Sequence, residues 1–270
     1  MLIAQITDFH IVEKNNKYYG FAHTSENLAL CVENINQLIP KPDLVLVTGD
    51  ITNTGLEEEC KQASLLLSKL KTPYYIIPGN HDNPTVMKKV FNKHCPIIAT
   101  QQSSTFINYV IDDYDLRLIA VDSTYQDHAG GELCETRLTW LDEQLAKDTL
   151  KPTIIFMHHP PVNIGVNETD LDGFIGAEKL GKIIEKYNNI ERIISGHVHL
   201  QTHTRWHGTI ITTAPSVSMK LVLDLTKKKP SQFVLEAPSY LLHYWTPAKN
   251  LVTHTVNLGK TDGPYLFAEH

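Results

Sequence analysis

The first two hundred residues alternate short, unbroken apolar runs with segments of helical periodicity. The run at residues 44–47 is rich in β-branched side chains, which is typical of a parallel strand buried on both faces. After Ser25, a residue type favoured at helix N-caps, Leu28, Val32 and Ile35 recur at helical spacing. This alternation predicts an α/β fold. The predicted strands are residues 2–7, 44–47, 74–77, 153–157 and 190–195, and the predicted helices are residues 25–39, 57–70, 138–145 and 180–187.

The pattern is more strand-like in the middle and at the end of the chain. Residues 106–111 and 116–121 are expected to form two strands joined by a polar turn. From about residue 203 the chain continues in short strand-like pieces. We therefore expect a core at residues 1–215 and a C-terminal extension at residues 216–270. The extension is expected to be continuous with the core and to serve as a cap or an oligomer contact.

Polar side chains follow five of the predicted strands. In an α/β fold, the loops beyond the carboxyl ends of the strands converge although they are far apart in sequence. Asp8 and His10 are two residues apart in an extended segment, so both side chains can face the same side. Asp50 stands alone after Gly49, and one carboxylate with two oxygens can bridge two metal ions. The strand-end group contains two aspartates, one asparagine and five histidines, namely Asp8, His10, Asp50, Asn80, His81, His158, His197 and His199.

The chemistry of this group indicates a site for two divalent cations. Imidazole suits zinc, iron, nickel and copper, while carboxylate and amide oxygens suit manganese and other harder ions. Each element alone is a weak signal, because a lone histidine at a strand end is more often a hydrogen-bonded structural residue. All of them together, each at a strand end, are hard to explain by coincidence.

Composition narrows the class of protein. The formal net charge of -6 argues against a nuclease and against non-specific binding to nucleic acid or an anionic membrane. The opening lacks a basic segment typical of a signal peptide, and no apolar stretch approaches the length of a membrane span. The four cysteines are widely spaced without a CxxC pair, which favours free thiols in a reducing cytoplasm. We expect a cytoplasmic globular protein.

The strand-end residues belong to five blocks that resemble the signature of the calcineurin-like metallophosphoesterase superfamily. The closer resemblance is to its class III cyclic-nucleotide phosphodiesterase branch, which includes bacterial glycerophosphodiesterases. It covers roughly residues 1–215 well and the tail loosely, and it implies a four-layer αββα sandwich with a small strand-rich C-terminal extension. The blocks are Asp8-Phe9-His10, Gly49-Asp50, Gly79-Asn80-His81-Asp82, His158-His159-Pro160-Pro161 and Gly196-His197-Val198-His199, accompanied by Tyr18-Tyr19-Gly20-Phe21.

The resemblance implies a role for each matching position. His81 would sit over the substrate phosphate and act on the leaving oxygen, and Asp82 would complete the catalytic set by orienting the loop or His81. His159 would be structural. The implied cofactors are two divalent ions per chain, drawn from iron, manganese, zinc and cobalt. Asp50 would bridge them, with Asp8, His10 and His199 on the first metal and Asn80, His158 and His197 on the second.

The expected reaction is hydrolysis of a phosphodiester by a metal-bound hydroxide that attacks phosphorus. A metal ion can lower the pKa of bound water to about 7, and two ions roughly 3.5–4 Å apart can clamp the attacking oxygen and the phosphate. The first expected substrate is a 3′,5′-cyclic nucleotide such as cyclic AMP. The alternatives are a glycerophosphodiester such as glycerophosphoethanolamine, or a promiscuous phosphodiesterase and phosphomonoesterase. A metal-binding scaffold without activity is disfavoured, because no block is missing.

The substrate pocket is less well defined by the sequence. Tyr19, Phe21 and His23 follow the first block and are expected to form a wall or lid, although ordinary loop packing is an equal alternative. Asn163 is expected to line the opposite wall. An aromatic group in the tail, which contains Tyr240, is consistent with a cap or a subunit contact, and a homo-oligomer is left open.

Overall fold

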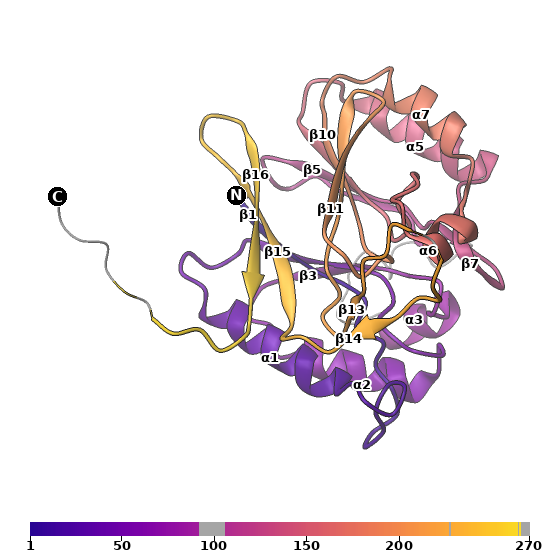
Figure 1. Cartoon of the computed structure of the whole chain (residues 1–270). Helices are drawn as coiled ribbons and strands as arrows, with labels where there is room; N and C mark the ends of the chain where they lie inside the picture. Colours follow the sequence, from indigo (N-terminus) through magenta and orange to yellow (C-terminus); the bar gives the residue numbers. More distant parts are fainter. Residues whose placement is uncertain (92–105, 227, 264, 266–270) are drawn as a thin grey trace.

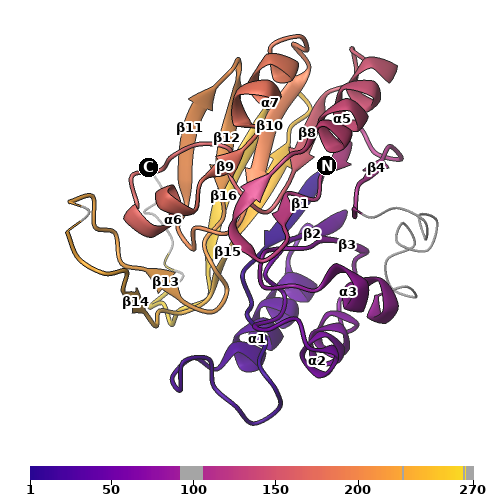
Figure 2. The ribbon, with the colours of Figure 1, turned by 90° about the vertical axis from the view of Figure 1, so that its right-hand side faces the viewer.

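The computed structural model describes residues 1–91, 106–226, 228–263 and 265. Two mixed β-sheets pack face to face, and helices cover the outer face of each (Figures 1 and 2). The predicted αββα sandwich is therefore confirmed. None of the described helices is long and apolar enough to cross a membrane.

The first sheet is formed by the N-terminal strands and by two strands from the C-terminal part of the chain. Three helices lie along its outer face, namely α1 (Thr24–Gln37), α2 (Glu57–Leu67) and α3 (Pro84–Val90) (Figure 1). The strands in spatial order are β16 (Leu251–Asn257), β15 (Ser239–Trp245), β1 (Leu2–Ile6), β2 (Leu44–Thr48) and β3 (Tyr74–Ile77).

The second sheet contains six strands among the described residues, and its outer face carries α5 (Glu135–Lys147) and α7 (Ala177–Ile184) (Figure 2). The strands in spatial order are β11 (Thr202–Trp206), β12 (Thr209–Thr213), β10 (Ile190–Ser195), β8 (Thr153–Phe156), β5 (Arg117–Ala120) and β4 (Tyr109–Ile111). The smaller elements are β6 (Thr124–Tyr125), β7 (His128–Glu132), α6 (Asn167–Asp172), β9 (Phe174–Ile175), β13 (Lys220–Leu221) and β14 (Phe233–Val234).

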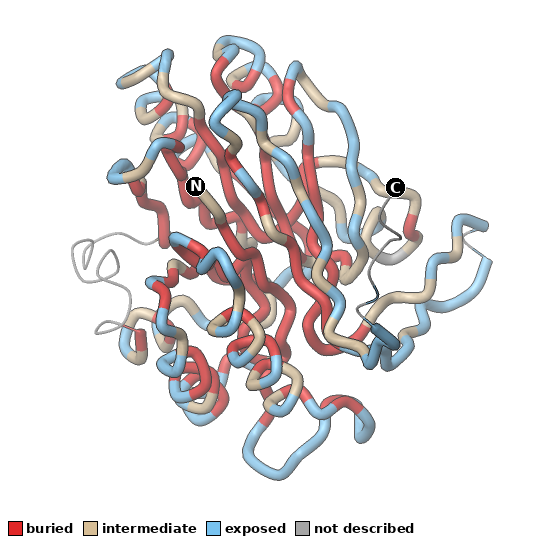
Figure 3. Tube along the Cα trace, turned by 90° about the vertical axis from the view of Figure 1, so that its left-hand side faces the viewer, coloured by how far each residue is buried: buried red, intermediate tan, exposed pale blue. Residues whose placement is uncertain are grey.

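The central strands are buried because each has helices on one side and the opposite sheet on the other. Every residue of β2, β5 and β8 is buried, as the red interior of the tube in Figure 3 shows. This double coverage explains why these strands are continuous apolar runs rather than alternating patterns. The periodicity did not predict α3, although its N-terminus has a local signal. The side chain of Asn83 caps the helix by accepting hydrogen bonds from the amides of Thr85 and Val86, ahead of a proline in the first turn.

The C-terminal strands extend the first sheet. Strand β15 pairs antiparallel with β1, so that Leu2 lies opposite Tyr244, and β16 pairs with β15 at the edge. Tyr240 and Trp245 point into the core, whereas Tyr244 is 39% exposed. Because β15 lies hydrogen-bonded between β1 and β16, we propose that residues 216–270 fold together with residues 1–215 rather than as a separate unit.

Replacing the buried aromatic ring on β15 tests this proposal. Tyr240→Ala is expected to lower the free energy of unfolding of the whole chain by about 3–5 kcal/mol, because it removes a fully buried ring and leaves a cavity. The matched control on the same strand, Tyr244→Ala, should change it by about 0.5 kcal/mol. Urea unfolding followed by circular dichroism measures both. A Tyr240→Ala value as small as that of the control would mean that β15 contributes little to the core.

Candidate functional site

The ends of β1, β2, β8 and β10 bring their polar residues to one point between the sheets. The backbone turns sharply there, since five of the strand-end residues have a positive φ. Such a conformation costs a non-glycine residue about 1–3 kcal/mol and persists only where the surrounding structure enforces it. The five residues are Asp8 (54°), His10 (48°), Asp50 (49°), His197 (70°) and His199 (55°).

Glycines permit the close approach of these turns. A Cβ on Gly196 would collide with the side chains of Thr7 and Asp8, and a Cβ on Gly49 would collide with the ring of His158. The glycines that precede the predicted ligands are therefore required by packing, which explains their place in the sequence blocks.

One group of side chains consists of Asp8, His10, Asp50 and His199, whose potential ligand atoms all lie within 4.8 Å of one another. The Nε2 atoms of His10 and His199 are 3.0 Å apart. His199 Nε2 is 3.4 Å from Asp8 Oδ1, and His10 Nε2 is 3.6 Å from Asp50 Oδ2. Two imidazoles and two carboxylates facing one another form a donor set that fits a divalent cation.

A second group is built around Asn80, whose amide oxygen lies 3.2 Å from His158 Nε2 and 3.1 Å from His197 Nδ1. His158 Nδ1 donates to the carbonyl oxygen of Thr48 at 2.7 Å, which leaves its Nε2 to face Asn80 and Asp50. Asp50 Oδ2 is 3.3 Å from that same Nε2. Asp50 therefore contacts both groups and is the side chain they share.

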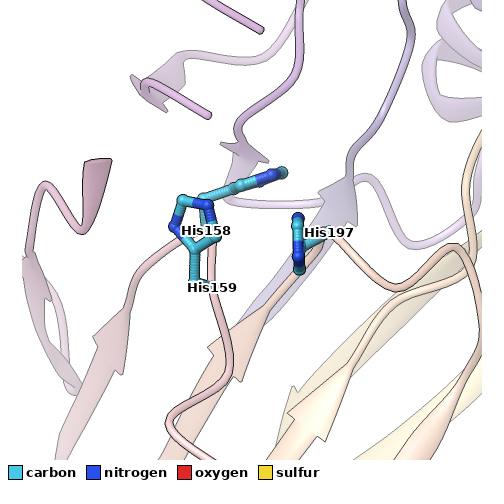
Figure 4. Close-up of side chains that lie close together, drawn as sticks. All are labelled: His158, His159 and His197. Atoms are coloured by element: carbon cyan, nitrogen blue, oxygen red, sulfur yellow. The ribbon is translucent and has the colours of Figure 1, made fainter. Parts of the chain in front are cut away.

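His159 lies beside His158 and His197, as Figure 4 shows, and its ring is close enough to be considered as a third ligand. Its hydrogen bonds argue otherwise. The Nε2–H donates to the carbonyl oxygen of Ala129 at 3.1 Å, so Nδ1 carries the lone pair, and the hydroxyl of Ser123 donates to it at 2.9 Å. Both ring nitrogens are occupied, which leaves no lone pair for a metal.

Electrostatics make this pocket attractive to cations. Burial opposes charge on Asp50, but the attraction of His158 and a hydrogen bond from it outweigh burial and hold the pKa of Asp50 well below its usual range. Burial lowers the pKa of His10 and of His197 to about 3, which keeps both imidazoles neutral, as metal ligands must be. Burial also opposes charge on His158, yet the charge of Asp50 raises its pKa to about 9. A divalent ion would displace that proton.

His81 sits at the rim of the two groups. Its backbone N–H donates to Asp50 Oδ1 at 2.9 Å, and its ring Nδ1–H donates to the carbonyl oxygen of Asn53 at 2.8 Å. The ring lies edge-on to that of His10, with centroids 4.7 Å apart. Since Nδ1 is engaged, Nε2 is the nitrogen with which His81 can exchange a proton with a bound molecule.

The carboxylate of Asp82 is half-buried and is held by the surrounding loops. It accepts hydrogen bonds from the amides of Ile51 (3.1 Å), Thr52 (2.8 Å) and Gly79 (2.9 Å), and from the Thr52 hydroxyl (2.6 Å). Burial, followed by repulsion from Asp50, raises the pKa of Asp82 to about 6. Asp82 thus ties together the loops that carry Asp50 and His81.

The residues expected to form a wall or lid of the pocket are largely exposed, and the contacts of two of them are defined. Tyr19 is 65% exposed and stacks on Phe233, at a centroid distance of 5.6 Å. Phe21 is also exposed, and the ring of His23 pairs with Glu26 at 3.0 Å. The sequence analysis missed Tyr18, which stacks flat on His10 at 4.9 Å. The only signal for it was its place in the Tyr-Tyr-Gly-Phe block.

Asn163 lines the wall of a small cavity on the side of the second group. The cavity has a volume of about 120 Å³, and its other polar lining includes Thr169, His159 and His197. Pockets that take drug-sized ligands measure roughly 300–1,000 Å³. This cavity therefore fits a small polar substituent next to His197.

Comparison with known proteins shows which family the chain resembles. The profile of the calcineurin-like phosphoesterase family matches residues 1–201. A relative from Arcobacter nitrofigilis, named probable glycerophosphodiester phosphodiesterase GpdQ, is 40% identical over 268 residues, covering 99% of this chain and 97% of that protein. The 3′,5′-cyclic-nucleotide phosphodiesterase alr5338 of a Nostoc species is 28% identical over 214 residues, covering 79% of this chain and 77% of that protein.

Among solved structures, a dimetal phosphatase from Danio rerio has a TM-score of 0.63 at 13% identity, covers 96% of this chain and 99% of its own, and supports the fold. Together these findings confirm the predicted superfamily and branch and the class of hydrolase, and the family implies two divalent metal ions. The chain belongs to the calcineurin-like phosphoesterase family.

Proposed function

We propose that this protein is a glycerophosphodiester phosphodiesterase that requires two divalent metal ions. The observation that carries the proposal is the 40% identity, across almost the whole of both chains, to a relative named for that activity. The Nostoc relative named for cyclic nucleotides is less similar, at 28% identity. Both are phosphodiesterases, so the difference concerns the substrate. It favours the glycerophosphodiester alternative over cyclic AMP, the substrate expected first from the sequence.

The small cavity beside His197 supports the same preference. At about 120 Å³ it is sized for a short polyol or amino alcohol rather than for a nucleoside. Its polar lining, with Asn163 and Thr169, offers hydrogen bonds to hydroxyl groups. We propose that one ester substituent of the substrate lies in this cavity, while the wall formed by Tyr19 bounds the site near His10.

We propose that Asp50 bridges the two ions, since it is the carboxylate that contacts both groups. The absence of thiolate from the described donors favours iron, manganese, zinc or cobalt. When bound, the ions would activate water as the nucleophile and neutralise charge on the phosphate. The proposed ligands are Asp8, His10 and His199 for the first ion and Asn80, His158 and His197 for the second.

His81 is proposed to assist the leaving oxygen. Asp50 fixes its backbone and Asn53 fixes its ring, so Nε2 is held in one direction without being used as a ligand. An alkoxide is a poor leaving group, and proton donation from Nε2 would lower the barrier to its departure. Asp82 acts through the loops that it holds, as a positioning residue.

The free thiols support the proposed cytoplasmic location. Among the described cysteines, Cys31 and Cys60 are buried and Cys134 is partly exposed, and all three are unpaired. Cys95 lies outside the described residues. A reducing compartment keeps such thiols free.

Two neighbouring histidines give a matched test of the ligand assignment. His158→Ala should reduce bound Mn²⁺ from two ions per chain to about one, because it removes a proposed ligand of the second ion. His159→Ala should retain both ions, because neither of its ring nitrogens has a free lone pair. Equilibrium dialysis followed by elemental analysis counts the ions. Loss of an ion from His159→Ala alone would reverse the assignment.

The role of His81 is tested with two leaving groups. His81→Ala should keep both metal ions but lose about 10²–10⁴-fold in kcat on glycerophosphoethanolamine, whose leaving alkoxide needs a proton. The loss should be much smaller on bis(p-nitrophenyl) phosphate, because p-nitrophenolate leaves without one. His254→Ala, an exposed histidine on β16, is the control. Equal losses on both diesters would rule out the acid role.

A substrate panel under matched Mn²⁺ loading tests the proposed function itself. We expect kcat/KM for glycerophosphoethanolamine to exceed that for cyclic AMP by at least about tenfold, since a small pocket discriminates by differential transition-state binding. Removal of metal with a chelator should abolish both activities. A preference for cyclic AMP would instead support the cyclic-nucleotide phosphodiesterase expected first from the sequence. If neither substrate were hydrolysed in a chelator-sensitive way, the protein would be a metal-binding scaffold without activity.

A further inference from the structure

A chain of polar side chains runs from Arg192 on β10, through the C-terminal hairpin formed by β15 and β16, to the base of the candidate metal site. Arg192 donates to the hydroxyl of Thr253 on β16. Thr253 contacts His243 Nδ1 at 2.9 Å, and His243 Nε2 contacts the amide oxygen of Gln5 at 2.9 Å. Gln5 and His243 are both fully buried. Polar groups at this depth need defined partners, because an unpaired one is costly.

The last link joins the two sheets. The side-chain amide nitrogen of Gln5 on β1 donates to the hydroxyl of Thr48 on β2 and to the carbonyl oxygen of Ser195 on β10, each at 3.0 Å. Strand β2 belongs to the first sheet and β10 to the second. One amide group therefore fastens the end of a strand in each sheet to the same point.

The hydrogen bonds allow one proton arrangement. Both N–H groups of Gln5 are used as donors, so its oxygen must accept, and His243 Nε2 must carry the proton. His243 Nδ1 then accepts from the hydroxyl of Thr253. Burial, followed by repulsion from Arg192, lowers the pKa of His243 to about 3, which keeps the ring neutral and consistent with this arrangement. The amide of Gln5 is thus held in a single orientation.

The two strand ends that Gln5 joins carry ligands proposed for the second metal ion. The carbonyl oxygen of Thr48 accepts the Nδ1–H of His158, and Asp50 is two residues further along. Ser195 is two residues before His197. A small change in the distance between β2 and β10 would therefore move these ligands apart.

The first ion shares Asp50 and takes His199 from the end of β10, but its other two proposed ligands, Asp8 and His10, are held by other contacts. The hydroxyl of Ser216 donates to the backbone oxygen of Asp8 at 2.8 Å. The backbone N–H of His10 donates to the backbone oxygen of Asp50 at 3.0 Å. Tyr18 covers the ring of His10. These bonds do not pass through Gln5.

We propose that Gln5 is a positioning residue that, held in orientation by His243, sets the spacing of β2 and β10 and thereby the affinity of the second metal position. The inference rests on the ligand assignment of the proposed function. It adds that the C-terminal hairpin, which is remote in sequence from the ligand blocks, influences the affinity of the second metal position.

Gln5→Met tests the proposal, because methionine has a similar length but neither donates nor accepts strongly here. We expect the affinity for the second Mn²⁺ ion to fall by about 10–100-fold, the range for losing a group that orients a ligand, and the affinity for the first to change by less than about threefold. Equilibrium dialysis against Mn²⁺ measures both steps. Activity lost at limiting Mn²⁺ should return when Mn²⁺ is raised, which a general folding defect would not allow.

Two further variants keep the test decisive. His243→Phe keeps a buried ring but leaves the amide of Gln5 free to turn, so it should weaken the second step in the same direction by a smaller factor. Tyr240→Phe, on the same strand as His243, removes only a hydrogen bond to Asn34 and should leave both steps unchanged. If Gln5→Met does not fold, His243→Phe decides alone.

Unchanged second-step affinity in a folded Gln5 or His243 variant, or an equal loss at both steps, would overturn the proposal while leaving the site intact. Failure of the unaltered protein to bind two Mn²⁺ ions would instead overturn the ligand assignment beneath it. The two failures are therefore distinguishable in one set of isotherms.

Discussion

The site depends on one buried carboxylate, Asp50, that faces two groups of ligand atoms at once. Its Oδ2 lies 3.3 Å from His158 and 3.6 Å from His10, and its Oδ1 holds the backbone of His81. A buried charge with this many partners is stable only while those partners remain in place, because removing one leaves the charge uncompensated. The arrangement therefore links cation binding and the placement of His81 to the same side chain.

The fold supplies what this carboxylate requires. Parallel strands from two sheets end at one edge, and each is buried on both faces, so the positions of their ends are fixed by packing. The positive φ angles after these strands turn side chains from opposite sheets toward each other. Around this rigid frame, we propose that the pocket beside His197 and the exposed ring of Tyr19 distinguish one phosphodiester from another.

Local sequence patterns predicted the central strands of both sheets, most helices and the polar side chains at the strand ends, because burial and strand ends leave a local signature. Contacts between residues that are far apart in the sequence leave no such signature. Nothing near Leu2 indicates that residues around Tyr244 pair with it, and nothing near Gln5 indicates that its amide bridges two sheets. The stacking of Tyr18 on His10 is likewise visible only in three dimensions. Substrate choice depends on such long-range contacts, which explains why the strand-end side chains were easier to predict than the substrate.

The most direct test of the shared carboxylate is anomalous X-ray diffraction from crystals soaked in Mn²⁺. We expect two anomalous peaks about 3.5–4 Å apart, each within bonding distance of a carboxylate oxygen of Asp50. A single peak, or two peaks of which one lies out of reach of Asp50, would contradict it.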